Sequence, residues 1–572
     1  MFHCRGRCRL MDVSPPRTLE AYGRFTAEDA EGAEISGKPL RSLRLSGEKS
    51  PRLHESNLTF ADVLDRVASR YPHKTAVKFE DTSYTYAQLR ARVDGLAGAL
   101  IAMGVRKGDR IAVLAPNCHQ YLELYLVCTL MGAILVPLNT RLNSQELQAT
   151  LDDSEPVALV VEGDFQDCFE GLRPRLSSVR HLLHIGRPFH GSQGYEELAS
   201  RDVTYTGARA SAEDVNCILY TGGTTGFPKG AMLTNGGWIA NTVNGLPALG
   251  ATQDDVNLVV TPLFHTAAVW PALMHLYVGG TSVITRGFDA KDALEVIERE
   301  RITFSHPVLS QVVALLEEPG VDGYDLSSLR TIQCTMSLPI PAFRRALKVF
   351  GNIVVPGYGL TEAGPMASLM PRSEMESWTA AGKDGPSVPS RYGSSGVALP
   401  NVEIRLVDDA GQEVPRGEVG EIAVRSRSLM KGYWKKPEAS AEALRDGWLW
   451  TGDMARMDEE GFLYFVDRKN GMIKTGGESV YPKEVEDAIL SHPAVLEVAV
   501  FGVPDAKWGE TVKAVVALRQ GATATERSLI EHCRRRIASY KKPTSIDFIE
   551  ALPRNPSGKV IKSELRAKYG DR

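Results

Sequence analysis

The sequence has no excess of charge of one sign and no apolar run long enough to cross a membrane. Its 66 Lys and Arg residues nearly balance its 70 Asp and Glu residues, which leaves a formal net charge of -4. That balance gives no indication of a nucleic-acid or anionic-membrane partner. The longest apolar run, "YLVCTLMGAILVPL" at residues 125–138, is shorter than the roughly 20 residues of a transmembrane helix. It predicts a buried helix that leads into a strand.

Paired cysteines are also missing. The eight cysteines are scattered, without a CxxC pair or zinc-ligand spacing, which predicts reduced thiols in a cytoplasmic enzyme. His3, Cys4 and Cys8 suggest a metal cluster by composition only. The first residues have no apolar segment of the kind found in a secretory signal. We expect an unstructured extension there, or a start codon assigned too early, with Met11 as the true first residue.

The length of 572 residues exceeds what one compact core holds, so at least two domains are expected. Alternating apolar strands and amphipathic helices predict an α/β fold with largely parallel sheets. Short strands with Gly, Pro and Asp turns follow residue 385 and predict a small β-barrel. The predicted organisation is a disordered extension (1–52), a large domain of stacked α/β sheets plus the barrel (53–469), and a small mobile α+β domain (470–572).

The stretch "YTGGTTGFPKG" at residues 220–230 has the composition of a phosphate-binding loop. A P-loop needs Gly before its Lys and Ser or Thr after it, whereas here Pro228 precedes Lys229 and Gly230 follows. The stretch comes directly after the apolar strand "NCILY", and ligands of parallel sheets bind beyond the carboxyl ends of strands. It therefore predicts a phosphate site of another kind.

Five motifs occur in order: "YTGGTTGFPKG", "YGLTE", "WLWTGD", "VDRKNGMIKTGGE" and "PRNPSGK". Together they resemble the adenylate-forming superfamily of acyl-CoA synthetases, nonribosomal adenylation domains and luciferases, over roughly residues 58–565. "FHTAAVW" and "VDRKNGMIKTGGESVYPKEVE" look most like fatty-acyl and other carboxylate–CoA ligases of lipid metabolism. The resemblance implies that ATP and a carboxylic acid form an acyl-adenylate and pyrophosphate, and that coenzyme A then displaces AMP.

The resemblance also implies which residues hold ATP and Mg²⁺. Glu362 matches the Mg²⁺ ligand, and a carboxylate is a hard ligand that suits a hard cation. Thr361 is placed for the α-phosphate. Gly359 and Tyr358 belong to the adenine site, where the tyrosine would stack. Where the family usually has Ser, this chain has Gly222. The expected β- and γ-phosphate contacts come from Thr221, Gly222, Gly223, Thr224, Thr225, Gly226 and Lys229.

Other motif residues match positions that serve the ribose and the acid. Asp453 is expected to accept the ribose hydroxyls, and Arg468 to make a second ribose or phosphate contact. His265, with Trp270 nearby, is expected to line the entry to the acid pocket and to belong to the catalytic set. A hydrogen-bonded core histidine at a strand end is an alternative for His265. The catalytic lysine is expected to be Lys559, bridging the attacking carboxylate and the α-phosphate.

The largest departure from the family pattern is "IQCTMSLPIP". The family typically reads Gly-Gly-Ala-Pro-Leu where this chain has residues 334–338. Cys334, Thr335 and Met336 therefore predict a reshaped acid pocket, in which Cys334 packs rather than reacts. A very long straight acyl chain is therefore not assured, whereas medium, branched, cyclic and aromatic acids remain open.

The family rotates its small domain so that two nucleophiles reach one site in turn. The corresponding hinge is Asn470, followed by the permissive Gly471. Rotation would withdraw Lys559 and bring the loop that contains Gly476, Gly477 and Glu478 to the pantetheine channel.

Alternatives stay open at this point. The acyl group could pass to the pantetheine of an acyl carrier protein, or the chain could be a non-catalytic scaffold. A homodimer is equally open.

The two half-reactions separate the role of Lys559 from a structural one. Lys559→Ala should abolish pyrophosphate release from ATP and acid but spare thioester formation from a preformed acyl-adenylate, because only the first step brings two anions together. Equal loss of both half-reactions would contradict the assignment.

Overall fold

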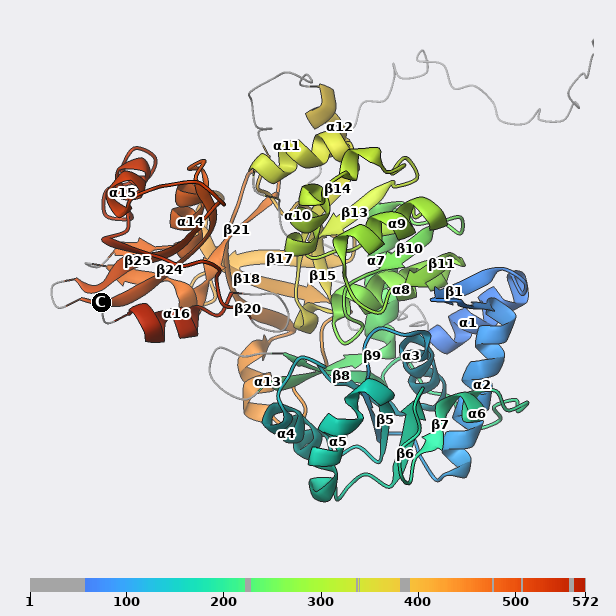
Figure 1. Ribbon diagram of the computed structural model, residues 1–572. Helices are drawn as coiled ribbons and strands as arrows, with labels where there is room; N and C mark the ends of the chain where they lie inside the picture. Colours follow the sequence, from blue (N-terminus) through green and yellow to red (C-terminus); the bar gives the residue numbers. More distant parts are fainter. Residues whose placement is uncertain are drawn as a thin grey trace, which may run out of the picture. The chain divides into compact units, whose positions relative to one another are not determined.

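The computed structural model describes residues 57–570 apart from 222–227, 336–337, 339, 381–390, 476–477, 506–507 and 555–559. The expected extension at 1–52 lies outside the described residues. The described residues belong to one compact unit. Figure 1 shows the arrangement of its helices and strands.

The first sheet has seven strands in the order β7-β6-β5-β3-β4-β8-β9. Its strands are parallel except for β9, which returns antiparallel to β8. The strands are β3 (Arg110–Leu114), β4 (Ile134–Pro137), β5 (Ala158–Glu162), β6 (His181–Ile185), β7 (Gln193–Gly194), β8 (Val215–Thr221) and β9 (Lys229–Thr234).

The second sheet has nine strands in the order β16-β15-β14-β13-β12-β10-β11-β1-β2. The central strands from β14 to β1 run parallel, so their carboxyl ends meet at one edge. The strands are β1 (Thr75–Phe79), β2 (Thr82–Thr85), β10 (Val256–Val259), β11 (Thr281–Ile284), β12 (Phe304–Ser305), β13 (Thr331–Cys334), β14 (Val354–Gly359), β15 (Met366–Leu369) and β16 (Val397–Ala398).

Helices cover both faces of these two sheets, as alternating side chains require. In β3, Ile111 and Val113 join the core beneath α2 and α3, while Ala112 and Leu114 join the core beneath α4 and α5. The helices up to the end of the second sheet are α1 (Phe60–Arg70), α2 (Tyr86–Ala102), α3 (His119–Met131), α4 (Ser144–Ser154), α5 (Gln166–Leu172), α6 (Tyr195–Ala199), α7 (Asn235–Leu249), α8 (Thr266–Val278), α9 (Ala290–Glu300), α10 (Leu309–Glu317), α11 (Ile340–Val349) and α12 (Arg372–Ala380).

The segment predicted as a small β-barrel forms a five-stranded antiparallel sheet, with β21 beside β20 and the path β17-β18-β20-β19. The described pairings make an open path, in which the end strands β17 and β21 each pair with one neighbour, and the long strand β20 pairs with three. The elements are β17 (Val402–Val407), β18 (Val419–Ser426), α13 (Pro437–Ala443), β19 (Leu444–Arg445), β20 (Trp448–Met457) and β21 (Leu463–Arg468).

The last part of the chain has its own mixed sheet and its own apolar core. Two helices, α14 and α15, contribute to that core, as expected for an α+β unit. The elements are β22 (Ile473–Thr475), β23 (Glu478–Val480), α14 (Pro482–Leu490), β24 (Val495–Asp505), β25 (Gly509–Leu518), α15 (Glu526–Arg534), β26 (Ser545–Phe548) and α16 (Lys562–Tyr569).

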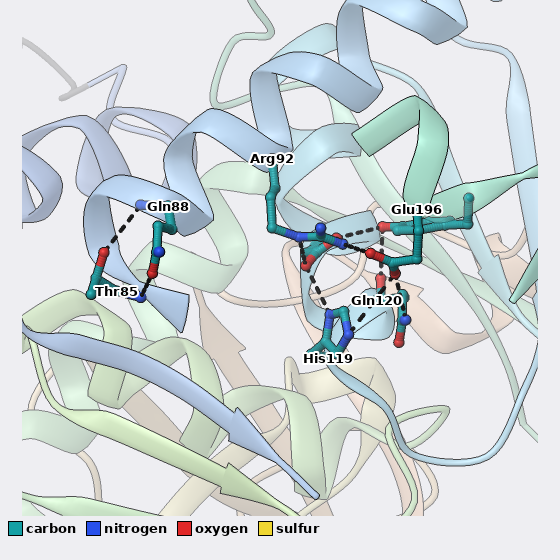
Figure 2. Close-up of polar contacts among 8 residues, drawn as sticks. Thr85, Gln88, Arg92, His119, Gln120 and Glu196 are labelled. Carbon is teal, nitrogen blue, oxygen red and sulfur yellow. Dashed lines mark hydrogen bonds and ion pairs between the residues drawn. The ribbon is translucent and has the colours of Figure 1, made fainter. Parts of the chain in front are cut away.

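Local predictions from the sequence hold where short-range signals are strong. The run at 125–138 spans the end of α3 and all of β4, and every residue of α3 is buried. Thr85 caps α2 through a capping box with Gln88, as drawn in Figure 2. In the described part of the chain, no helix is long and apolar enough to cross a membrane.

A buried polar cluster joins α2, α3 and α6. The fully buried Glu123 accepts hydrogen bonds from Arg92 Nε at 2.7 Å, His119 Nδ1 at 2.9 Å and the Tyr195 hydroxyl at 3.0 Å. Figure 2 shows Arg92 and His119 pointing toward Glu196 at the edge of the cluster. Burial raises the pKa of Glu123, but the bonds from His119 and Arg92 together outweigh burial and hold it below its usual value.

Glu123→Gln should lower the free energy of unfolding by about 3 kcal/mol at neutral pH, because the buried Arg92 loses its buried charged partner and keeps Glu196, which is half exposed. A lowered folded-state pKa gives stability that is present above the unfolded value, about 4.3, and is lost below it. Denaturant unfolding should therefore show the gap between wild type and variant shrinking as pH falls below about 4.3. The exposed Glu197→Gln is the control. A gap that does not change with pH would contradict this account.

Candidate functional site

The carboxyl ends of β8 and β14 bring two of the predicted motifs together. β8 ends at Thr221, and β14 ends at Gly359, followed by a short 3-10 helix, Thr361–Ala363. Gly359 cannot be another residue without a shift of the backbone, since a Cβ there would lie 1.9 Å from the carbonyl oxygen of Pro365. Backbone crowding thus explains one glycine of the "YGLTE" motif.

Glu362 lies at the centre of this region. Its Oε1 accepts hydrogen bonds from the Thr221 hydroxyl at 3.0 Å and from the Tyr433 hydroxyl at 3.1 Å. Lys229 Nζ lies 5.2 Å from the centre of the Tyr433 ring. The site therefore combines one carboxylate, two hydroxyls and a cation, which are the groups that bind a hydrated Mg²⁺ and phosphate oxygens.

Tyr433 was not among the predicted residues. It comes from the segment before α13, where Met430 N donates to the Glu362 carbonyl at 2.9 Å. Burial and then the nearby Glu362 raise the pKa of the Tyr433 hydroxyl, so it stays a donor to that carboxylate. In the sequence, Tyr433 belongs to none of the five motifs, so no motif indicated it.

The adenine and ribose residues also come together. The Tyr358 hydroxyl donates to Asp453 Oδ2 at 2.8 Å, and Arg468 Nε lies 2.9 Å from Asp453 Oδ1. Asp453 and Tyr358 are buried, whereas the Arg468 side chain is about half exposed. Burial and then Asp453 raise the pKa of Tyr358, which keeps its hydroxyl protonated. Phe465 stacks at 6.5 Å from the Tyr358 ring.

The residues predicted for the acid lie near the ends of β10 and β13. His265 immediately precedes α8, with its ring 4.6 Å from that of Phe264. Trp270 is fully buried in α8. Cys334 ends β13 and is fully buried in an apolar core, as predicted for a packing residue, and Thr335 follows half-buried.

Several predicted residues lie outside the described residues, namely Gly222, Gly223, Thr224, Thr225, Gly226, Met336, Gly476, Gly477 and Lys559. Asn470 falls in the 3-10 helix Lys469–Gly471, and Glu478 begins β23. The connection after β8 differs from that of a P-loop. The glycine-rich stretch connects β8 to the antiparallel strand β9, so Lys229 begins a strand. In a P-loop a helix follows instead.

Asn117 is a second residue that the sequence did not indicate. Its side chain is buried in the turn between β3 and α3, where Nδ2 donates to the Thr261 carbonyl at 3.0 Å and Oδ1 accepts from Leu263 N at 2.7 Å. The Tyr125 hydroxyl donates to the Leu263 carbonyl at 3.2 Å. Side chains from the first sheet thus hold the loop that precedes His265.

Comparisons with known proteins identify the family and the fold. The family described as AMP-binding enzyme matches residues 64–434, and its C-terminal domain matches residues 484–559. A feruloyl-CoA synthase of an Amycolatopsis species is 40% identical over 88% of this chain and 98% of its own length. A long-chain-fatty-acid–CoA ligase of Bacillus subtilis is 32% identical over 89% and 94%. An anthranilate CoA ligase solved with anthranoyl-AMP superposes with a TM-score of 0.81 at 28% identity, covering 90% of this chain and 97% of that one.

Asn117→Ala should loosen the loop before His265, because it removes both bonds to the loop backbone. We expect the KM for the acid to rise by about tenfold, since small misplacements at a reacting centre are costly, while the KM for ATP stays unchanged. Steady-state pyrophosphate release measures both values. Asn139→Ala, in the loop after β4, is the matched control. Equal changes in both KM values would show that Asn117 acts on the fold as a whole.

Proposed function

This chain belongs to the family of AMP-binding enzymes, and from that premise we propose that the acid it activates carries an aromatic ring. The protein is an AMP-forming acid–CoA ligase, and its predicted membership of the adenylate-forming superfamily is confirmed. ATP and coenzyme A are its expected co-substrates. The finer question concerns the acid.

The observation that carries the proposal is the identity to relatives of stated substrate. The feruloyl-CoA synthase is 40% identical, against 32% for the long-chain-fatty-acid–CoA ligase.

In the first step, the carboxylate must approach the polyphosphate. Two unit charges 4 Å apart repel by about 4 kcal/mol at an effective dielectric of about 20. Lys229 and the hydroxyls of Thr221 and Thr361 would offset that repulsion, together with Lys559. Glu362 would hold Mg²⁺, which supplies positive charge to the phosphate oxygens. Asp453 and Arg468 would fix the ribose.

The second step needs a change of position, for which we keep the predicted hinge at Asn470. Withdrawal of Lys559 and approach of the loop with Gly476, Gly477 and Glu478 would admit the thiol. The proposed boundary divides the chain into a large domain (53–469) and a small one (470–572).

Two other outcomes retain some support. A straight fatty acid stays a candidate because of the fatty-acid–CoA ligase relative. A ligase that passes the acyl group to a carrier-protein pantetheine would have the same adenylation residues as one that uses coenzyme A. Those residues therefore do not distinguish the two acceptors.

A panel of acids tests the proposal, with pyrophosphate and AMP measured separately. We expect cinnamate-type and benzoate-type acids to drive pyrophosphate release without coenzyme A, and AMP release only with it. Octanoate and palmitate should be poor substrates. Preference for the straight chains would overturn the aromatic assignment, and AMP release that requires a carrier protein would identify the other acceptor.

A further inference from the structure

One buried carboxylate lies between the ribose residues and the predicted hinge. Glu421, in β18, is 5% exposed. Its Oε2 accepts a hydrogen bond from Lys469 Nζ at 2.8 Å, and its Oε1 accepts one from the backbone N–H of Gly452 at 3.0 Å. Gly452 directly precedes Asp453, and Lys469 directly precedes Asn470. The two oxygens of Glu421 therefore bind two segments that the proposed function uses for different purposes.

The ion pair between Glu421 and Lys469 is the stronger of two that Lys469 makes. Its Nζ also lies 2.7 Å from Asp409, whose side chain is 91% exposed. Burial lowers the pKa of Lys469, but its hydrogen bonds to Asp409 and Glu421 outweigh burial and hold that pKa above its usual value. Water screens the pair with Asp409. Glu421 is screened far less, and a buried carboxylate needs such a partner.

The sheet shows how far this ion pair reaches. Glu421 in β18 pairs with Met454 in β20, and Asp453 in β20 pairs with Arg468 at the end of β21. The strands β18 and β21 therefore lie two strand spacings apart, about 10 Å. A glutamate and a lysine side chain together bridge that distance. The pair thus connects the middle of the five-stranded sheet to the segment that leaves its last strand.

The turn before Asp453 is held by the same part of β18. The Thr451 hydroxyl donates to the Ile422 carbonyl at 2.8 Å and accepts from Asp453 N at 3.1 Å. Gly452 has a φ of 70°, a conformation that favours glycine. A Cβ there would meet no atom within 4 Å. The backbone conformation, rather than space, therefore explains this glycine, and its N–H donates to Glu421.

Only residues 469–472 lie between β21 and β22, the first strand of the last sheet. Lys469 is the first of these four residues, and Glu421 holds its side chain to the large domain. A change of backbone angles between the two sheets then falls on residues 470–472. Gly471 is among them, and glycine adopts many backbone conformations without strain.

We propose that Glu421 is a positioning residue that connects the ribose turn to the start of the hinge. The small domain then rotates about residues 470–472, while the turn that carries Asp453 stays in place. The inference rests on the proposed function, because it assumes the hinge and the two-step reaction. Neither Glu421 nor Lys469 touches the reacting atoms. Both steps depend on the pair, because each step needs a part of the small domain to arrive at the same point.

Lys469→Met tests the pair by kinetics, because it keeps the length of the side chain but removes its charge. With the acid that wild type uses best, pyrophosphate release and thioester formation from the preformed acyl-adenylate should each slow by about tenfold. The KM for ATP should not change, because the ribose turn keeps its bonds. The amount of pyrophosphate released without coenzyme A counts active sites, so a loss of folded protein is not mistaken for a slower step.

Two further variants separate this role from general stability. Lys469→Arg should restore both rates, since a guanidinium can pair with the same carboxylate. Lys78→Met is the matched control, because Lys78 is 40% exposed, against 38% for Lys469, and pairs with Glu300 at 2.7 Å in another sheet. It should keep both wild-type rates.

Trypsin tests the same pair without any substrate, because it cleaves after a lysine whose side chain can enter its specificity pocket. Glu421→Gln removes the charge but keeps an oxygen for the N–H of Gly452. Cleavage between Lys469 and Asn470 should become about tenfold faster, as measured by mass spectrometry of the new N-terminus. Glu300→Gln, the control, should cleave there at the wild-type rate. Glu421→Ala also loses the bond to Gly452, so it should raise the KM for ATP as well.

The outcomes separate this inference from the proposed function. If wild type forms no acyl-CoA with any acid of the panel, the proposed function fails and the inference with it. If wild type forms acyl-CoA but Lys469→Met matches Lys78→Met, or slows only one of the two steps, the inference alone is overturned. Unchanged tryptic cleavage in folded Glu421→Gln would overturn it too. Should that variant fail to fold, Lys469→Met and Lys469→Arg decide the question.

Discussion

The site depends on the position of one carboxylate, that of Glu362. It accepts hydrogen bonds from Thr221 at the end of a strand in the first sheet and from Tyr433 in the segment before α13. Its own backbone follows β14 of the second sheet. Three parts of the chain, more than 200 residues apart at the extremes, therefore converge on one group that can hold a cation. Without that convergence, Lys229 and Thr221 would have no fixed relation to Thr361.

Parallel strands explain why the other residues assemble around it. The strands β10, β12, β13 and β14 end at one edge, so the loops that follow them face a common region. In the proposed function, Tyr358 and Thr361 at this edge serve the nucleotide, and His265 in the loop before α8 serves the acid.

The sequence was informative wherever the signal was local. The helix and strand predicted at 125–138 depend on a few neighbouring residues. Tyr433 and Asn117 were missed because their partners are more than 70 residues away in the chain. The hairpin after β8 was missed because antiparallel pairing of β9 depends on tertiary context. The pairing order of the five-stranded sheet likewise depends on contacts between distant strands, which turn residues do not specify.

The most direct test is a crystal structure with a non-hydrolysable adenylate of 4-hydroxycinnamate. The account predicts the ribose hydroxyls on Asp453, the phosphate mimic beside Thr361 and Glu362, and the aromatic ring beside the loop that precedes α8. A ring that points away from α8, toward the core with α9 and α10, would contradict it.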